Sequence, residues 1–139
     1  MSETFEVLLV DDEEIVCKRL RPAVEKMGCA VETSMELRAA LDRIDEKSFD
    51  VVVTDLRTDG IDGIQVLEHV QQRSPRTKVV VITGTATMTL AREVMQKGGF
   101  DFLSKPFKPE DLRRVILAAA EELGKPLDYE VPPAEPNGG

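Results

Sequence analysis

The chain has 139 residues, of which 42% are hydrophobic and 32% charged, and its formal net charge at pH 7 is −8. This length and composition predict one globular domain with an ordinary core, and no apolar run approaches the ~20 residues of a membrane span. Nucleic acid is a poor partner for such a chain, because phosphate contacts need clustered Lys and Arg and the basic residues here are dispersed. The N-terminus lacks the basic residues and apolar core of a signal peptide, so we expect a cytoplasmic protein that binds no membrane. Cys17 and Cys29 have no metal-type spacing and are expected as buried thiols.

Apolar runs alternate with segments of helical spacing along the chain. The runs predict buried strands at about 6–10, 29–33, 49–55, 78–83 and 100–103. The helical spacings predict helices at about 15–27, 35–44, 64–74, 86–97 and 109–123. Repeated strand and helix pairs of this length are typical of right-handed βα units. The sequence therefore predicts an α/β fold, with a five-stranded parallel sheet and helices on both faces.

Several helices show a predicted start or a predicted inward face. Ser34 is the predicted N-cap of the second helix, and Pro109 fits the first turn of the last. Ile15 begins the apolar stripe of the first helix. In the fourth helix the predicted stripe is Met88, Ala91, Val94 and Met95. That stripe leaves Leu90 outside it, as Leu117 lies outside the stripe of the fifth helix.

Polar residues follow four of the predicted strands. They are Asp11 and Asp12, Asp55, Thr83 and Lys105. In a parallel sheet these strand ends share one edge, where ligands bind in open α/β sheets. Each residue alone has an ordinary alternative, since either of the first two acids serves as a helix cap, Asp55 opens a turn, Thr83 fills a strand and Lys105 is solvated. Their common placement favours a single pocket.

The residue types in this pocket suit phosphoryl transfer. Carboxylates brought close together repel one another, and oxygen ligands with room for water suit Mg²⁺. A lysine and a hydroxyl supply the charge and the donors that a transferred phosphoryl group needs. Asp55 is the expected nucleophile and would form an acyl phosphate. Because Lys105 has to turn back into the pocket, the Lys105–Pro106 peptide is predicted to be cis.

Over about residues 5–123 the chain resembles the receiver domain of two-component response regulators. The motifs that carry the resemblance are Leu-Val-Asp-Asp-Glu at 9–13, Val-Thr-Asp-Leu-Arg at 53–57, Asp-Gly at 62–63, Val-Ile-Thr-Gly at 81–84 and Asp-Phe-Leu-Ser-Lys-Pro-Phe at 101–107. The resemblance implies a flavodoxin-like (βα)5 fold with strand order 2-1-3-4-5. Residues 1–123 would form the receiver domain, and 124–139 a Pro- and Gly-rich tail or linker.

The resemblance also implies a role for each pocket residue. Asp55 accepts a phosphoryl group from a histidine kinase or phosphotransfer protein, while Thr83 and Lys105 contact the phosphoryl oxygens. The implied Mg²⁺ ligands are Asp11, Asp12, Asp55 and the main-chain carbonyl of Arg57. Thr83 and Phe102 are the implied switch residues. Such a domain is a phosphoacceptor rather than an enzyme, beyond catalysing its own phosphoryl transfer and a slow autodephosphorylation.

Two departures from the family pattern stand in otherwise matching motifs. Thr58-Asp59 replaces the usual Met-Pro after the phosphoacceptor, which removes a ring that fixes φ and predicts a looser loop. Gly99 replaces a usual Ala and predicts a looser approach to the fifth strand. Neither departure falls on a catalytic position.

The output is predicted on the face formed by the fourth helix, the fifth strand and the fifth helix. Leu90, Phe102 and Leu117 would form one apolar patch there, for an output partner or a second copy on phosphorylation. Three functions remain open at this point. They are a stand-alone receiver, the receiver part of a longer DNA-binding transcription regulator, and an aspartate-nucleophile phosphohydrolase, which lacks an evident general base.

Overall fold

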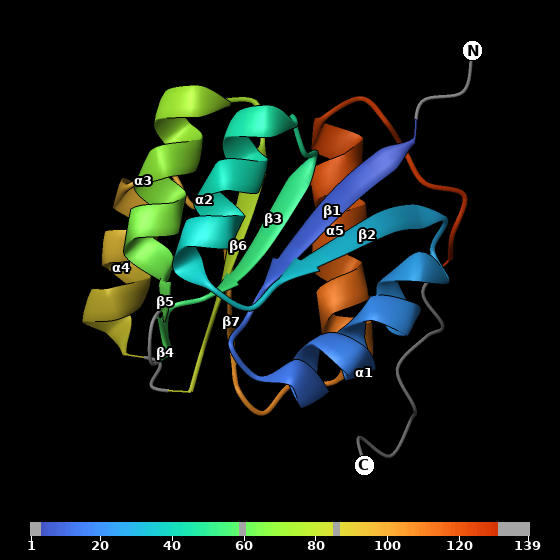
Figure 1. The fold of residues 1–139 in the computed structure, drawn as a ribbon. Helices are drawn as coiled ribbons and strands as arrows, with labels where there is room; N and C mark the ends of the chain where they lie inside the picture. The colour runs from blue at the N-terminus through green and yellow to red at the C-terminus, as the bar shows by residue number, and fades with distance from the viewer. Residues whose placement is uncertain (1–3, 59–60, 85–86, 131–139) are drawn as a thin grey trace.

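A computed structural model describes residues 4–58, 61–84 and 87–130. Its strands in chain order are β1 (Phe5–Val10), β2 (Cys29–Ser34), β3 (Val51–Asp55), β4 (Arg57–Thr58), β5 (Ile61–Asp62), β6 (Lys78–Thr83) and β7 (Asp101–Ser104). Its helices are α1 (Glu14–Glu25), α2 (Leu37–Glu46), α3 (Gly63–Arg73), α4 (Met88–Gln96) and α5 (Pro109–Glu122). The main sheet is parallel with the order β2-β1-β3-β6-β7, which confirms the predicted order 2-1-3-4-5 (Figure 1).

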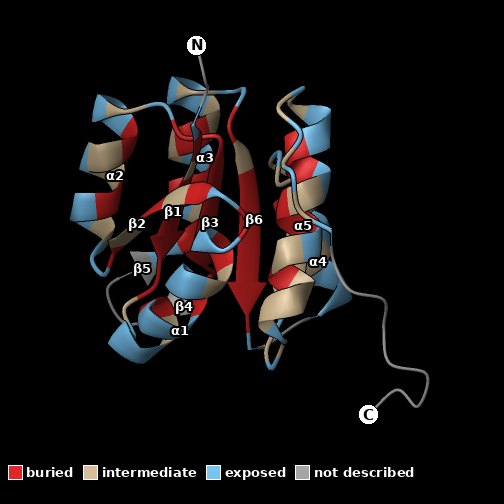
Figure 2. Ribbon diagram, turned by 90° about the vertical axis from the view of Figure 1, so that its right-hand side faces the viewer, coloured by how far each residue is buried: buried red, intermediate tan, exposed pale blue. Residues whose placement is uncertain are grey.

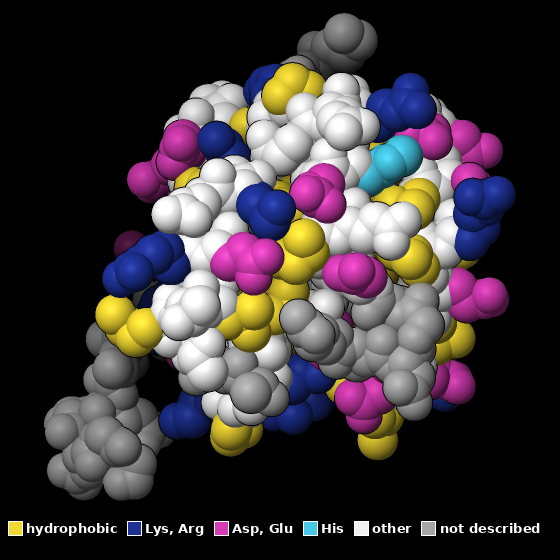
Figure 3. All heavy atoms as spheres, turned by 90° about the vertical axis from the view of Figure 1, so that its left-hand side faces the viewer, with side chains coloured by type: hydrophobic (Ala, Val, Ile, Leu, Met, Phe, Trp, Pro, Cys, Tyr) yellow, Lys and Arg dark blue, Asp and Glu magenta, His cyan; other side chains and the backbone are white. Residues whose placement is uncertain are grey.

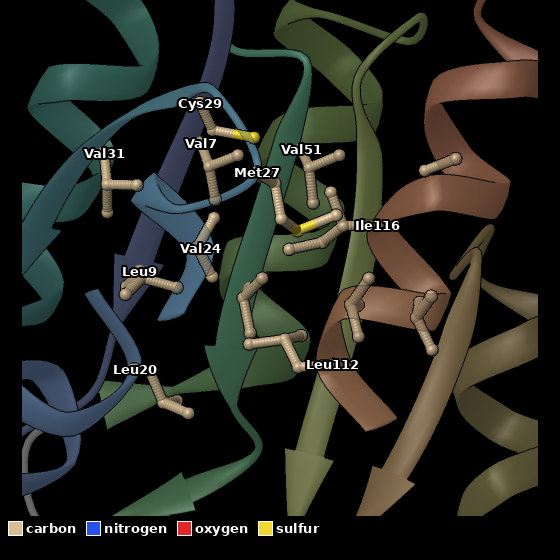
Figure 4. Packing of buried hydrophobic residues seen from close by; sticks show 14 of the residues in the cluster. Val7, Leu9, Leu20, Val24, Met27, Cys29, Val31, Val51, Leu112 and Ile116 are labelled. Carbon is tan, nitrogen blue, oxygen red and sulfur yellow. The ribbon is translucent and has the colours of Figure 1, made fainter. Parts of the chain in front are cut away.

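The sheet lies between two layers of helices (Figure 1). α1 and α5 cover one face, where the first hydrophobic cluster includes Val7, Val24, Val51 and Ile116 (Figure 4). α2, α3 and α4 cover the other face, where Leu8, Val52, Val66 and Val94 belong to the second cluster. Successive residues of one strand enter opposite clusters because side chains alternate across a sheet. This two-sided burial confirms the predicted α/β architecture.

β3 is the central strand, and all five of its residues are buried (Figure 2). It pairs with β1 on one side and β6 on the other, so that Asp55 stands beside Ile82. Its β-branched residues suit a strand with packed neighbours on both faces. The consequence is a rigid support for the acid that ends it.

The loop after β3 contains more structure than the sequence indicated. A short antiparallel pair, β4 with β5, forms where an irregular loop was predicted, with Arg57 opposite Asp62 and Thr58 opposite Ile61. Asp62 also begins α3, because its Oδ1 accepts from the amides of Ile64 (3.0 Å) and Gln65 (3.3 Å). The predicted effect of Thr58-Asp59 is not tested, since Asp59 lies outside the described residues.

Three predictions about helix faces are wrong. Ile15 is 73% exposed, because the inward face of α1 is formed by Cys17, Leu20 and Val24 and Ile15 lies on the opposite side of the helix. Met88 and Met95 are also exposed, while Leu90 packs against the second cluster with buried Val94. Leu90 and Val94 are four residues apart and so share the inward face of α4. The predicted stripe was right for Val94 but wrong for the two methionines, because methionine and leucine are equally apolar and the pattern does not distinguish them.

The N-cap prediction for the second helix is wrong, and the residues of the predicted apolar patch lie on both faces of the sheet. Ser34 ends β2, and the residue that precedes α2 is Glu36, whose side chain makes no capping hydrogen bond. Leu90 and Phe102 pack with the second cluster, whereas Leu117 packs with the first. Leu90 and Phe102 therefore pack over one face of the sheet and Leu117 over the other, so a patch that joins all three would have to pass around the edge strand β7 and stays a prediction.

Several local predictions are confirmed. The Lys105–Pro106 peptide is cis, Pro109 opens α5, and Gly124 follows α5 with φ +73°. Both cysteines are buried. On the side covered by α2 and α3, charged groups separate the exposed hydrophobic side chains (Figure 3), and the histidine there, His69, bonds Asp45 at 2.8 Å. Within the described residues, no helix has the length and apolar character that crossing a membrane requires.

Candidate functional site

Asp55 ends β3 as a buried carboxylate, with 3% of the residue exposed. Two backbone hydrogen bonds hold the next residue, from Leu56 to Ile82 O (2.7 Å) and from Gly63 to Leu56 O (2.8 Å). Gly63 allows this closure, because a Cβ there would overlap the Asp55 carbonyl oxygen and lie 2.7 Å from Leu56 Cα. The loop therefore folds back tightly on the strand end and fixes the position of the acid.

Lys105 follows β7, the edge strand two places from β3, and reaches this acid along the carboxyl edge of the sheet. Its Nζ lies 2.5 Å from Asp55 Oδ2, 3.6 Å from Asp11 Oδ2 and 3.8 Å from Glu13 Oε1. The Lys105 amide bonds Thr83 O at 2.8 Å, which ties the segment after β7 to the end of β6. The ordinary alternative for Lys105, a solvated surface lysine, is thereby excluded.

The acids after β1 form the second half of the pocket. Asp11 is buried, and its Oδ1 accepts from the Glu13 amide at 2.9 Å. One oxygen from each of Asp11, Asp12 and Glu13 lies within 4.8 Å of the others. α1 begins after these residues, and its N-cap Glu13 makes no side-chain capping bond. This compact set of carboxylate oxygens fits a hard cation by donor type and by spacing.

Burial and charge act against each other in this pocket. Burial raises the pKa of the Asp11 carboxyl, and the Glu13 amide and the Lys105 charge only partly offset this effect. For Lys105, partial burial favours the neutral amine, but the hydrogen bond to Asp55 and the nearby carboxylates raise the pKa of the ammonium overall. The lysine is therefore a permanent cation at neutral pH.

Thr83 and Phe102 lie on the neighbouring strands β6 and β7, two register positions apart, and differ in burial. Thr83 is 4% exposed at the end of β6, and Phe102 is half-buried on β7, where it pairs with Val81. The Phe102 ring packs against the second cluster. Both predicted switch residues thus lie on the two strands nearest α4.

The structure brings Asp11, Asp55 and Lys105 into direct contact range and sets Thr83 at the neighbouring strand end. Arg57 follows Asp55 in β4, two residues beyond the strand, so its role as a carbonyl ligand remains a prediction. The sequence reasoning gave no role to Glu13, which contacts both the acid cluster and Lys105. The sequence does contain a sign of this role, because Glu13 is the third of the consecutive acids that follow β1.

A flavodoxin-like sheet with an acidic pocket and one lysine at its carboxyl edge defines a class of phosphoacceptor domains. The sequence model of the response regulator receiver domain matches residues 7–117. The chain belongs to this family of two-component signalling proteins, and it is a phosphoacceptor signalling module rather than an enzyme.

Curated relatives agree with this assignment. The photosynthetic apparatus regulatory protein RegA of Rhodobacter capsulatus is 32% identical over 120 residues, which are 86% of this chain and 65% of RegA. The transcriptional regulatory protein FixJ of Azorhizobium caulinodans is 34% identical over 90% of this chain and 58% of its own length. AlgB of Pseudomonas aeruginosa, a regulator of alginate biosynthesis, is 34% identical, and the match covers 25% of it. The chain thus spans less than two thirds of these relatives.

Solved structures share the fold. The beryllofluoride-activated NtrC4 receiver domain dimer is 36% identical, with a TM-score of 0.80 over 86% of this chain and 99% of that one. A CheY-like receiver domain from Methanospirillum hungatei has a TM-score of 0.83 over 88% of this chain and 98% of its own, at 24% identity. At that identity, the second likeness supports the fold alone.

Proposed function

We propose that Asp55 is the phosphoacceptor of this domain. The observation that carries the proposal is the 2.5 Å contact between Lys105 Nζ and Asp55 Oδ2 at the carboxyl edge of the sheet. An Asp55 oxygen would attack the phosphorus atom as the bond to the donor breaks, which forms an acyl phosphate. A histidine kinase or phosphotransfer protein is the proposed donor.

Lys105 and Thr83 would hold the transferred group. The Lys105 ammonium faces the position where the phosphoryl oxygens gather negative charge, and it needs no reorganisation to do so. The Thr83 hydroxyl, at the end of the neighbouring strand β6, would donate to another of these oxygens. Both side chains stand at the ends of strands, so their positions relative to the phosphoryl group are fixed by the sheet.

We further propose that Asp11, Asp12, Asp55 and the Arg57 carbonyl bind Mg²⁺. The close spacing of the carboxylates after β1 and the burial of Asp11 support this set. When bound, Mg²⁺ supplies positive charge that offsets the repulsion between the carboxylates and the phosphoryl oxygens. Glu13 adds a fourth acid at this site, and its Oε1 lies 3.8 Å from Lys105 Nζ.

The proposed output is a two-state shift of Thr83 and Phe102. Thr83 would move toward the phosphoryl group, and the Phe102 ring would follow into the space that it leaves. The readout face is α4, β7 and α5, where Met88 and Met95 are exposed on α4. The relative NtrC4 is a dimer when activated by beryllofluoride, which supports a second copy of this chain as one partner. The other proposed partner is an output protein in the cytoplasm.

A titration of the amide NMR spectrum with beryllofluoride and Mg²⁺ tests this proposal. We expect shifts at 11–13, 55 and 83, and a second set across α4, β7 and α5. Asp55→Asn should lose both sets, whereas Asp62→Asn, which keeps a good N-cap, should retain them. Shifts confined to the pocket would contradict the proposed output face, and shifts that persist in Asp55→Asn would contradict the proposed phosphoacceptor.

A second candidate is the receiver part of a longer transcription regulator. It is favoured by the relatives RegA, FixJ and AlgB, which extend well beyond the matched region. The length of the natural gene product separates this candidate from a stand-alone receiver. A product that continues into a DNA-binding region supports the longer regulator, and one that ends with this chain contradicts it.

A further inference from the structure

The residues after α5 show a regular alternation of burial. Lys125, Leu127 and Tyr129 are half-buried, whereas Pro126, Asp128 and Glu130 are exposed. A period of two is that of an extended segment with one face on a surface. The Pro- and Gly-rich composition suggested a solvated linker, but a solvated linker would not alternate between half-buried and exposed residues.

Lys125 anchors the start of this segment in an ion pair. Its Nζ lies 3.0 Å from both carboxylate oxygens of Asp50 and 3.3 Å from Thr4 O. Asp50 is 5% exposed just before β3, and its Oδ2 also accepts from the Glu6 amide at 2.8 Å. A buried carboxylate is costly unless it is paired, and Lys125 is closer to Asp50 than Arg76, whose Nη1 lies 3.9 Å from Oδ1, so this contact favours the docked position of Lys125. The pair lies at the opposite end of β3 from Asp55.

Leu127 and Tyr129 continue the contact along the helices. Both pack against the first hydrophobic cluster. Arg113 of α5 lies over the Tyr129 ring, with 5.7 Å between its Cζ and the ring centroid. The same arginine donates to Ala23 O of α1 at 2.9 Å, so it joins the two helices beneath the tyrosine. Figure 1 shows the chain turning back after α5 toward the C-terminal end of α1.

We propose that residues 125–130 form a strap, an intramolecular segment that belongs to the folded domain and occupies the seam between α1 and α5. The domain then extends to about residue 130 rather than 123. Tyr129 then lies over Arg113, next to α1, instead of beyond the end of α5. A partner that binds at this seam has to displace the strap, so the strap competes with it.

The strap has its own spectroscopic probe, because Tyr129 is the only tyrosine and the chain has no tryptophan. We expect the acrylamide quenching constant of tyrosine fluorescence in the native full chain to be about twofold below that in urea, since docking shields one side of the ring. Lys125→Met should raise the constant toward the urea value. Asp128→Asn, an outward-facing neighbour, should leave it unchanged.

Circular dichroism keeps this test independent of unfolding. If Lys125→Met unfolds the domain because Asp50 loses its closest cation, the double variant with Asp50→Asn and Lys125→Met, which lacks both charges, takes the place of the single variant. A quenching constant in the native chain equal to that in urea would overturn the proposed strap. A Lys125 variant that stays folded and keeps the wild-type quenching constant would also overturn it. Protection lost in the Lys125 variants and retained in Asp128→Asn supports it.

Discussion

Lys105 Nζ contacts Asp55 Oδ2 at 2.5 Å across the end of β6, which lies between their two strands in the sheet. The residues are 50 positions apart in the chain, and the Lys105 amide bonds Thr83 O at the end of that middle strand. Acid, hydroxyl-bearing residue and cation therefore stand in a row along three neighbouring strand ends. This row makes the carboxyl edge of the sheet the chemical site.

Replacement of Lys105 should slow phosphorylation without unfolding the domain. Lys105→Met removes a preorganised cation, which is worth about 10²-fold or more in rate by analogy with a lost oxyanion donor. The pKa of Asp11 should also rise further, because the Lys105 charge lowers it. The measurement is the rate of adduct formation with acetyl phosphate. Lys108→Met, on an exposed side chain of the same loop, is the control, and equal rates for the two variants would refute the role of Lys105.

Gly63 should tolerate no side chain. Gly63→Ala places a Cβ against the Asp55 carbonyl and 2.7 Å from Leu56 Cα, so we expect a loss of about 1–3 kcal/mol in the free energy of unfolding. Urea unfolding measures this loss. Gly84→Ala is the matched control, because a Cβ there meets nothing within 4 Å. If the two variants are equally stable, the loop does not close as tightly as described.

Mg²⁺ should stabilise the domain through its acidic cluster. Binding to the native state alone adds about 2.7 kcal/mol at a hundredfold excess over Kd, and EDTA should reverse the gain in melting temperature. Asp12→Asn should lose most of this gain, whereas Asp101→Asn, at the start of β7, should keep it. An undiminished gain in Asp12→Asn would place the cation elsewhere.

The stability of the domain should fall in acid partly through Glu32. Hydrogen bonds from Arg43 and Lys47 lower the pKa of Glu32 to about 2 from its usual 4.5. The stabilisation is therefore present above pH 4.5 and is lost as the pH falls toward 2. Because all three side chains are about one third exposed, we expect no more than about 1 kcal/mol. Glu32→Gln should flatten this part of the curve of unfolding free energy against pH, and an unchanged slope would contradict the ion pairs. Glu121→Gln, exposed on α5, is the control.

The order of strands and the pocket were predictable because both depend on short apolar runs. Val51–Asp55 has a single reasonable interpretation, since four β-branched residues before an acid fit a central strand and little else. The same runs place Asp11, Thr83 and Lys105 at one edge once the sheet is parallel. Glu13 was missed because its contacts with the acid cluster and with Lys105 form only when the turn after β1 is folded.

The helix faces were harder to predict because helical spacing leaves the direction of the core open. On α4, Met88 and Leu90 are both apolar, and only contact with the sheet decides that Leu90 turns inward. The strap after α5 escaped prediction for a related reason. Its inward side consists of Lys125, Leu127 and Tyr129, whose anchoring partners Asp50 and Arg113 are distant in sequence.

Intact-mass analysis after treatment with acetyl phosphate and Mg²⁺ tests the central claim most directly. The wild-type chain should gain the mass of one phosphoryl group, and Asp62→Asn should gain the same. Asp55→Asn should gain none, because its amide cannot form an acyl phosphate. An undiminished adduct on Asp55→Asn, or no adduct on the wild-type chain, would contradict the assignment of Asp55 as the phosphoacceptor.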